Sequence, residues 1–470
     1  MTVKDKKEAV TEAVEGMITR RIAEFVVETG YRQIPGEAIK IAKGTILDNL
    51  GCALAGAREP AVEIVTRYVS ELGSKPEVGV IARGFWAAAP LAALVNGTMA
   101  HVLDYDDVAA TWFGHPTAVL MPTAMAMGEK YKMPGEAVLE AYILGFEVGA
   151  RINMGLTRAY YEGGWHATIA TGTMAAAVVA AKMMKLDVQK IRVALGIAAS
   201  LAGGLKRNFG TMTKSFHAGT AAQNGIIAAS LAKEGFTAEE NILEAPQGYC
   251  QMFGRNYKLD NITDGLGSSF HICSTGIAIK PYPCCRGMHQ SIDAILHIIE
   301  EHDIKAADVV EVECRTLPYL PVQLYHHRPK TGLEGKFSIE YCMAAALIDR
   351  CIRFTQFQDK MVNRSDAQEL LQKVRYTHPE KIDPERGLFR EPQTVTVRLK
   401  DGRELRCEVT NPKGDPANPL SQEELEDKFR DCARAALSTQ DIDRCLEMVS
   451  SLESLKDVSL LMGMLTSSKD

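Results

Sequence analysis

The spacing of hydrophobic residues is helical from residue 18 to about residue 267. In the segment 137–152 apolar residues recur at steps of three and four, which is the pattern of an amphipathic helix. The segments 167–184, 191–202 and 218–232 instead carry alanine, glycine, threonine and valine on every side, which is typical of helices buried in a bundle with close backbone approach. The first part of the chain is therefore predicted to be helical.

After residue 267 the pattern changes to that of a mixed structure. The stretches 309–314, 395–399 and 404–409 are rich in β-branched residues and predict strands. The last two flank Asp401 and Gly402, and an Asp-Gly pair between two such stretches is a strong hairpin signal. Helical stretches lie between the strands, so this region is predicted to be an α+β unit.

The pattern returns to helix near the end of the chain. A cluster of asparagine, proline and glycine at 411–416 interrupts regular structure, and Ser421 with Glu424 forms a capping box that starts a new helical run. We therefore predict a mainly α protein, with a large all-helical domain built from both chain ends and a smaller inserted α+β lid. The three segments are 1–267, 268–410 and 411–470.

Composition and charge narrow the class of protein. Hydrophobic residues make up 46% and charged residues 24% of 470 residues, as in a globular enzyme large enough for two structural units. The formal net charge is −6 without a long basic run, so a nucleic-acid partner is not expected. No stretch of ~18 apolar residues occurs, so we expect no signal peptide and no membrane span, and predict a cytoplasmic protein.

The cysteines give no sign of a metal cluster. There are 11, they are scattered, and only Cys284 and Cys285 are adjacent. Without a CxxC pair or another recognisable spacing they are predicted to be reduced thiols, and an iron–sulfur cluster is not expected.

Acidic residues and histidines are dense in one segment of the helical part. The stretch 101–107 contains His101, Asp104 and two further aspartates, and His115 follows shortly after. Three readings are open: a solvated turn with a helix cap, a catalytic group, or a divalent metal site. The spacing matches no zinc motif, so no metal is predicted.

Two further residues stand at the starts of buried helical segments. His166 precedes the run at 167–184, where the positive end of a helix dipole favours a neutral imidazole suited to proton relay, although a capping role fits equally. Lys214 lies among small residues at 210–219, which lack the order of a phosphate loop. It is either a surface cation or an anion anchor.

Two motifs in the α+β part complete the set. Prolines at 281 and 283 fix an extended loop that brings Lys280 and Arg286 near each other, and such a pair can hold a carboxylate. Tyr341 begins an apolar helical stretch, a position at which most tyrosines are packing residues.

Taken in order, these motifs resemble those of the MmgE/PrpD family. The segments that carry the resemblance are Asp-Tyr-Asp-Asp at 104–107, His-Pro at 115–116, Thr-Lys-x-x-His-x-Gly at 213–219 and Lys-Pro-Tyr-Pro at 280–283. The resemblance extends over roughly residues 18–460. It implies a helical domain with an α+β lid, a homodimer, and a lyase for a small polycarboxylic acid that needs neither an organic cofactor nor a metal.

The resemblance also implies which residues act. Carried over by position, the catalytic residues are Asp104, His115, His166, Lys214 and Tyr341. The expected substrate-binding residues are Lys280, Cys285 and Arg286. Two positions depart from the animal decarboxylases of the family, because Cys285 stands where they have histidine and Val108 where they have threonine.

Several reactions fit such a site. Removing a proton or carbon dioxide next to a carboxylate places negative charge on the substrate, and cations aimed at that charge are the catalysts that this requires. We expect a hydro-lyase of a 2-methylcitrate-like acid first, then a carboxy-lyase of the cis-aconitate type, then an epimerase or isomerase. A catalytically inactive binding or regulatory member of the family is the alternative from another class.

Overall fold

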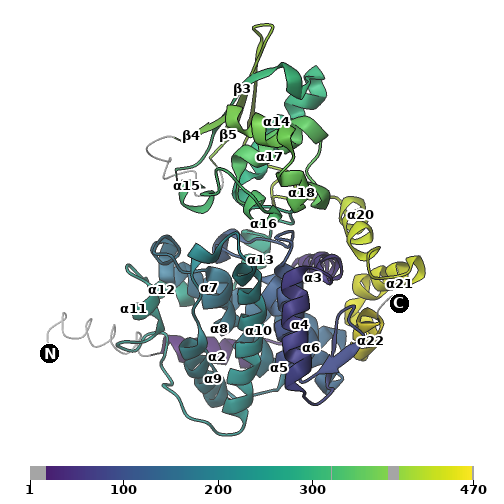
Figure 1. Ribbon diagram of the computed structural model, residues 1–470. Coiled ribbons are helices and arrows are strands. Elements are labelled where there is room, and N and C mark those ends of the chain that lie inside the picture. The colour runs from purple at the N-terminus through teal and green to yellow at the C-terminus, as the bar shows by residue number, and fades with distance from the viewer. Residues whose placement is uncertain (1–16, 319, 379–390, 468–470) are drawn as a thin grey trace, which may run out of the picture.

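The computed structural model describes residues 17–318, 320–378 and 391–467, and the fold is mainly α, as predicted. Figure 1 shows a large helical unit below a smaller unit that contains a sheet. The helices that the larger unit takes from the first part of the chain are α2 (Ile18–Glu28), α3 (Gly36–Gly56), α4 (Pro60–Leu72), α5 (Ala89–His101), α6 (Thr117–Tyr131), α7 (Gly135–Glu162), α8 (Ala167–Met183), α9 (Val188–Leu201), α10 (Met212–Lys233), α11 (Tyr249–Phe253), α12 (Asp260–Thr263) and α13 (His271–Ser274). The last segment contributes α20 (Gln422–Ala433), α21 (Thr439–Ser450) and α22 (Ser459–Thr466).

The middle of the larger unit is a close contact of small residues between α5 and α10. A Cβ atom added to Gly219 would lie 2.0 Å from the carbonyl oxygen of Leu94, and one added to Gly97 would lie 2.8 Å from the Cα atom of Gly219. The two backbones can touch only because side chains are absent there. This contact holds the last turn of α5, with His101, beside the first turns of α10, with Lys214.

The smaller unit is a four-stranded sheet covered by helices. Its helices are α14 (His289–His302), α15 (Leu320–Gln323), α16 (Gly332–Gly335), α17 (Ile339–Asp349), α18 (Asp359–Val362) and α19 (Ser365–Leu370). Its strands are β3 (Val309–Arg315), β4 (Val374–Thr377), β5 (Gln393–Leu399) and β6 (Glu404–Val409), in the order β4-β3-β5-β6. The hairpin predicted at residues 401–402 joins β5 to β6, whereas the parallel strand β4 was not predicted.

The described residues form two hydrophobic cores. One takes residues from Ile18 to Ile277 and again from Leu425 to Leu465, because α20 packs against α3 and returns the chain end to the larger unit (Figure 1). The other takes Phe209 and residues between 284 and 399. The first core therefore extends beyond the predicted boundary at residue 267, and the boundaries at about residues 267 and 411 stay a prediction.

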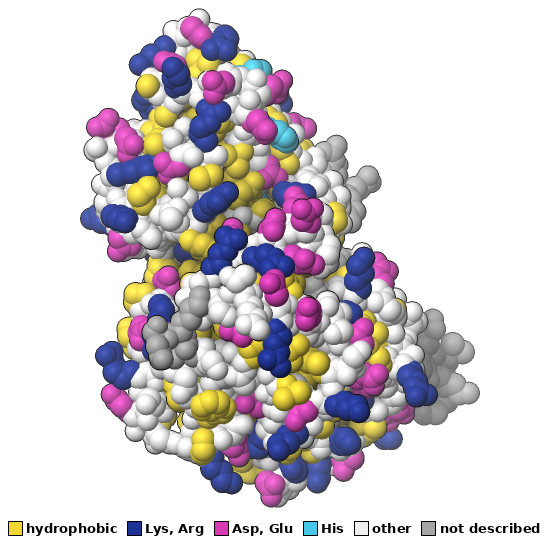
Figure 2. Space-filling model, turned by 90° about the vertical axis from the view of Figure 1, so that its right-hand side faces the viewer, with side chains coloured by type: hydrophobic (Ala, Val, Ile, Leu, Met, Phe, Trp, Pro, Cys, Tyr) yellow, Lys and Arg dark blue, Asp and Glu magenta, His cyan; other side chains and the backbone are white. Residues whose placement is uncertain are grey.

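Two details qualify the predicted architecture. The larger unit is not purely helical, because β1 (Val78–Val80) and β2 (Phe85–Ala87) form a two-stranded antiparallel sheet in it. On the face that Figure 2 shows, lysine and arginine side chains are interspersed with aspartate and glutamate over both units, and no basic stripe forms there. None of the described helices combines the length and the apolar character needed to cross a bilayer.

Candidate active site

The loop between α5 and α6 carries the acidic residues of the site. Asp104 adopts a left-handed backbone conformation with φ 52°, which costs a non-glycine residue roughly 1–2 kcal/mol. The residue is only 4% exposed. Such a conformation persists where the surroundings fix it, so the loop is a place where function is to be sought.

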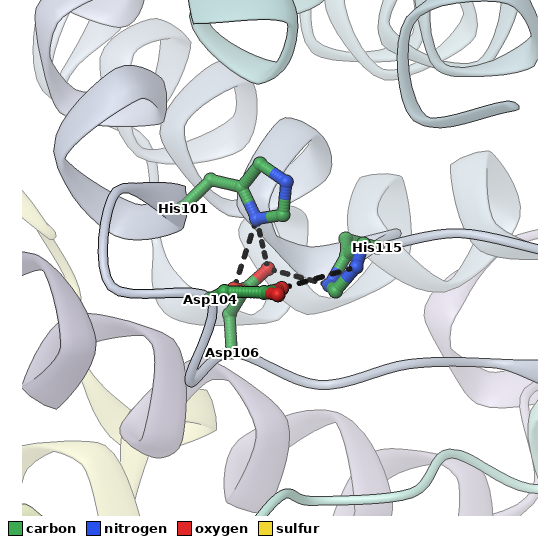
Figure 3. Close-up of side chains that lie close together, drawn as sticks. All are labelled: His101, Asp104, Asp106 and His115. Carbon is green, nitrogen blue, oxygen red and sulfur yellow. Dashed lines mark hydrogen bonds and ion pairs between the residues drawn. The ribbon is translucent and has the colours of Figure 1, made fainter. Parts of the chain in front are cut away.

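One aspartate lies between two imidazoles (Figure 3). The Nδ1 atom of His101 lies 2.9 Å from the carboxylate of Asp106, and the Nδ1 atom of His115 lies 3.0 Å from the same carboxylate. The Nε2 atom of His115 lies 3.6 Å from Oδ1 of Asp104. Burial alone would raise the pKa of Asp106, but the two histidines hold it well below its usual range.

Two lysines from distant segments meet the other aspartate. Lys214 on α10 places its Nζ atom 2.9 Å from Oδ1 of Asp104, and Lys280 places its Nζ atom 2.8 Å from the same oxygen. Against the effect of burial, the two ammonium groups lower the pKa of Asp104 well below its usual range. Both lysines are buried, so the cluster presents a carboxylate with two cations in a region of low dielectric.

A hydrogen-bonded chain fixes the tautomer of His101. Its Nδ1 atom faces the carboxylate of Asp106, which is a hydrogen-bond acceptor. Its Nε2 atom lies 3.1 Å from Nζ of Lys214. Because the ammonium group is the donor in the second contact, Nε2 must be the acceptor, and Nδ1 carries the hydrogen. The chain of contacts therefore holds both His101 and Lys214 in one orientation.

A cavity of about 60 Å³ opens on this cluster. Seven of the eight residues predicted for the site line it: Asp104, His115, His166, Lys214, Lys280, Cys285 and Arg286. The other lining residues are Val108, Phe113, Gly114, Tyr161, Phe209, Gly287, Gln323 and Phe337. Since ligand pockets usually measure ~300–1,000 Å³, a substrate requires the cavity to widen.

The histidines of the cavity are neutral. Burial, despite the neighbouring Asp106, lowers the pKa of His115 to about 3. Burial and the neighbouring His217 lower the pKa of His166 well below its usual range. The two Nδ1 atoms of His166 and His217 lie 2.9 Å apart, a contact that needs one donor and one acceptor. Near neutral pH both cavity histidines are therefore uncharged, the form that a general base must have, and their low pKa values make them weak bases in the empty site.

The remaining predicted binding residues have partners of their own. Arg286 makes an ion pair of 2.7 Å with Asp415 at the edge of the cavity. Burial raises the pKa of the Cys285 thiol to about 11, so this side chain is neutral, and its sulfur lies 4.0 Å from Oε1 of Gln323. Arg286 nevertheless lines the cavity.

The structure does not bring Tyr341 to this cavity. Its side chain is 1% exposed in the core of the smaller unit, and its hydroxyl donates to the carbonyl of Gln356. The predicted catalytic role therefore has no geometric support, and the packing reading fits the contacts. The residues that sequence reasoning did not select are His101, Asp106 and His217, although Asp106 and His217 lie within the quoted motifs and His101 lies just before the first of them.

The same cluster could be taken for a metal site. Ligand atoms of His101, Asp104, Asp106 and His115 lie within 4.8 Å of one another. However, both Nδ1 atoms already face Asp106, and two ammonium groups occupy the cation positions at Asp104. A divalent ion would have to displace those groups, so the donor set fits internal ion pairs and proton transfer better than a metal.

Together the fold and the site define a helical protein with an inserted α+β unit and a buried cationic cavity between them. Residues 20–261 match the MmgE/PrpD N-terminal domain, and residues 282–454 match the MmgE/PrpD C-terminal domain. The chain belongs to the MmgE/PrpD family, which confirms the resemblance seen in the motifs.

Curated relatives are similar over nearly their whole length. The cis-aconitate decarboxylase of Mus musculus is 30% identical over 95% of this chain and 93% of its own. The human cis-aconitate decarboxylase is 29% identical over 99% of this chain and 95% of its own. A cis-aconitate decarboxylase-like protein of Aspergillus oryzae is 27% identical over 96% of this chain and 98% of its own. These relatives support a lyase.

Proposed function

We propose that this chain is a lyase for a small tricarboxylic acid and that it works as a hydro-lyase on a 2-methylcitrate-like substrate. Family membership and the curated relatives support the broader part of the proposal. The observation that carries the narrower part is the pairing, in one cavity, of neutral histidines with buried cations. Dehydration next to a carboxylate begins with a base that accepts a proton, and a neutral imidazole is such a base.

The charged and the neutral residues of the cavity have different proposed roles. Lys214, Lys280 and Arg286 bind substrate carboxylates, and the two lysines also stabilise the negative charge that develops when a C–H bond next to a carboxylate breaks. His115 or His166 accepts that proton. Asp104 keeps the two ammonium groups in place while the site is empty of substrate.

The atoms, electrons and protons of the proposed reaction balance without a cofactor. The electron pair of the broken C–H bond first delocalises into the adjacent carboxylate and then forms the C=C bond as the C–O bond breaks. The leaving hydroxide takes the proton held by the imidazolium, so the products are an unsaturated acid and water. The histidine returns to its neutral form, ready for another turnover.

Decarboxylation is the second candidate, and the relatives favour it, because three of them are cis-aconitate decarboxylases or named as similar to them. That reaction needs a proton donor at the carbon that loses carbon dioxide, a role that a neutral histidine fills less readily than that of a base. Val108 and Cys285, which depart from the animal decarboxylases of the family, also both line the cavity. These two features place decarboxylation second.

One panel of substrates separates the possibilities. We would incubate the pure protein with 2-methylcitrate, citrate, cis-aconitate and iminodisuccinate, with and without EDTA, and follow alkene absorbance, carbon dioxide and optical rotation. Alkene formation from 2-methylcitrate that survives chelation is the expected result. Carbon dioxide from cis-aconitate would establish the second candidate, whereas binding without turnover of any acid would indicate an inactive family member.

A homodimer is proposed on the resemblance alone. The test is light scattering of the purified chain at micromolar concentration, where the mass should be twice the 51.4 kDa of one chain. A mass of one chain at all concentrations would contradict this part of the proposal.

A further inference from the structure

Three successive carbonyl groups next to the cavity each accept a hydrogen bond from a different buried lysine. They belong to residues 103–105, the turn that contains Asp104. Lys336 donates to the first carbonyl, Lys280 to the second at 2.8 Å, and Lys428 to the third at 2.9 Å. The three lysines come from separate parts of the chain, so three distant segments bind the backbone of this turn.

This turn needs support of that kind. With φ 52°, Asp104 has a left-handed conformation that an aspartate adopts only at a cost in free energy. Its amide also donates to the carbonyl of His101, at 3.1 Å. The conformation aims the carboxylate at the lysines of the cavity, so the contacts that fix it also fix the site.

Lys428 connects the turn to a second part of the site. Its Nζ atom also donates to the carbonyl of Lys280, at 2.8 Å, and lies 3.7 Å from the ring centre of Tyr105. An ion pair of 2.5 Å with Asp48 on α3 holds the ammonium group in place. Lys428 therefore ties α20, near the chain end, to Tyr105, which follows Asp104 in the turn, and to Lys280, which contacts the Asp104 carboxylate.

Lys336 makes the corresponding link from the smaller unit. It lies just before α17 and donates to the carbonyl of Pro283, at 3.2 Å, as well as to that of Leu103. Neither Lys336 nor Lys428 lines the cavity of about 60 Å³. Both are buried, with exposed fractions of 5% and 8%.

From these contacts we infer that Lys336 and Lys428 are positioning residues that hold Asp104 and Lys280 in their working geometry. The inference rests on the proposed function, because it takes Asp104 and Lys280 as parts of the active site. A buried ammonium group on a backbone carbonyl restrains the loop without contacting the reacting atoms. Losing either lysine should therefore slow the chemistry, although it removes none of the cations that bind the substrate.

The first test is substitution with matched controls. Lys428→Met should lower kcat on the order of 100-fold, because a misplacement of about 1 Å can have that effect, with a smaller change in KM. Lys336→Met should act in the same way, and the double variant should lose less than the product of the two single losses. Lys413→Ala, which removes a half-exposed ion pair with Glu424, is the control and should keep normal turnover.

The second test is rescue by an external amine. A cavity of about 560 Å³ on the other side of the turn is lined by Lys428, Tyr105 and Pro281, so a small amine can reach the space that Lys428→Ala leaves. Ethylamine or propylamine should restore part of the lost kcat, and propanol should not. A purely structural role predicts a lower melting temperature with normal kcat per folded molecule and no rescue, and that result would overturn the inference.

A readout without turnover separates this inference from the proposed function. In hydrogen–deuterium exchange, Lys428→Met should speed exchange of the Asp104 amide, whereas amides of α8, in the core of the larger unit, should be unchanged. If the wild type converts none of the acids, the proposed function fails, and the exchange result alone decides the inference. Unchanged exchange at residues 103–106 would overturn it.

Discussion

At the scale of single residues, the site depends on the balance of charge around Asp104. Two ammonium groups lie within 2.9 Å of one buried carboxylate oxygen, and each removes part of the cost of burying the others. A substrate carboxylate that enters the cavity can compete with Asp104 for the same lysines. The buried carboxylate thus stands in for the substrate while the site is empty.

This balance predicts the effect of removing Lys214. Lys214→Ala should lower kcat on the order of 100-fold and raise KM, because it removes both a carboxylate anchor and a donor to the developing charge. It should also lower the free energy of unfolding by roughly 3–5 kcal/mol, since a buried partner of Asp104 is lost. Steady-state kinetics and thermal melting test this, with the exposed Lys40→Ala on α3 as the control. Normal turnover in the folded fraction would contradict the catalytic role.

The two cavity histidines should behave differently from the lysine. His115→Ala and His166→Ala should lower kcat with less effect on apparent affinity, because a general base acts mainly in the transition state. If either residue serves only in packing, its variant should melt at a lower temperature and keep near-normal turnover per folded molecule. Measuring kcat, KM and melting temperature on the same samples separates the two outcomes.

The sequence predicts the residues of the site that lie close to one another along the chain better than those that lie far apart. Asp104 and His115 stood out as a local cluster and were assigned by the family resemblance, and Lys280 and Arg286 stood out because two prolines lie in the loop between them. Lys336 and Lys428 gave no such signal, since a lysine that donates to a distant carbonyl looks like any other lysine in one sequence. Tyr341 was assigned by position in a motif, and its hydroxyl has a backbone partner inside the core.

At the scale of elements, the contact between α5 and α10 positions the site. Gly219→Ala would place a Cβ atom 2.0 Å from the carbonyl oxygen of Leu94, so the helices must separate. We expect a loss of about 1–3 kcal/mol of stability. A lower kcat should accompany it, because Lys214 on α10 would shift away from His101 on α5.

A matched glycine on another helix provides the control. A Cβ atom at Gly463, within α22, would meet no atom within 4 Å. Gly463→Ala should therefore stabilise the protein by about 0.5–1 kcal/mol and leave kcat unchanged. Thermal melting and kinetics of the two variants test the pair. Equal effects of Gly219→Ala and Gly463→Ala would show that the close contact does not position the site.

Hydrophobic spacing predicts most of the elements, for a physical reason. The Ala-rich helices α8 and α10 and the hairpin of β5 and β6 follow from local composition and turn chemistry. The strand β4 (Val374–Thr377) was missed because it has only four residues and only the first of them is buried. It therefore shows no alternation of buried and exposed positions. It pairs in parallel with β3, a contact that depends on tertiary structure.

At the scale of the whole molecule, the buried histidines couple folding to pH. In five of them burial lowers the pKa below its ordinary value, in His115 to about 3 and in His217 to about 4. The other three are His101, His166 and His289. Below pH ~6.5 the unfolded chain binds protons on these residues while the folded chain does not, so stability must fall as the pH is lowered.

The expected result is a steep loss of stability between about pH 6.5 and pH 4, where each such histidine adds up to ~1.4 kcal/mol per pH unit to the slope. Asp104, whose pKa is held low by Lys214 and Lys280, adds to the loss below about pH 4, because its stabilising charge is present only above that range. Urea unfolding at a series of pH values measures the slope. His217→Gln should flatten it, and His302→Gln, at an exposed position, should not. If the free energy of unfolding does not change between pH 7 and pH 5, these histidines take up protons in the folded protein as they do in the unfolded chain. That result would remove the basis for treating His115 and His166 as neutral bases.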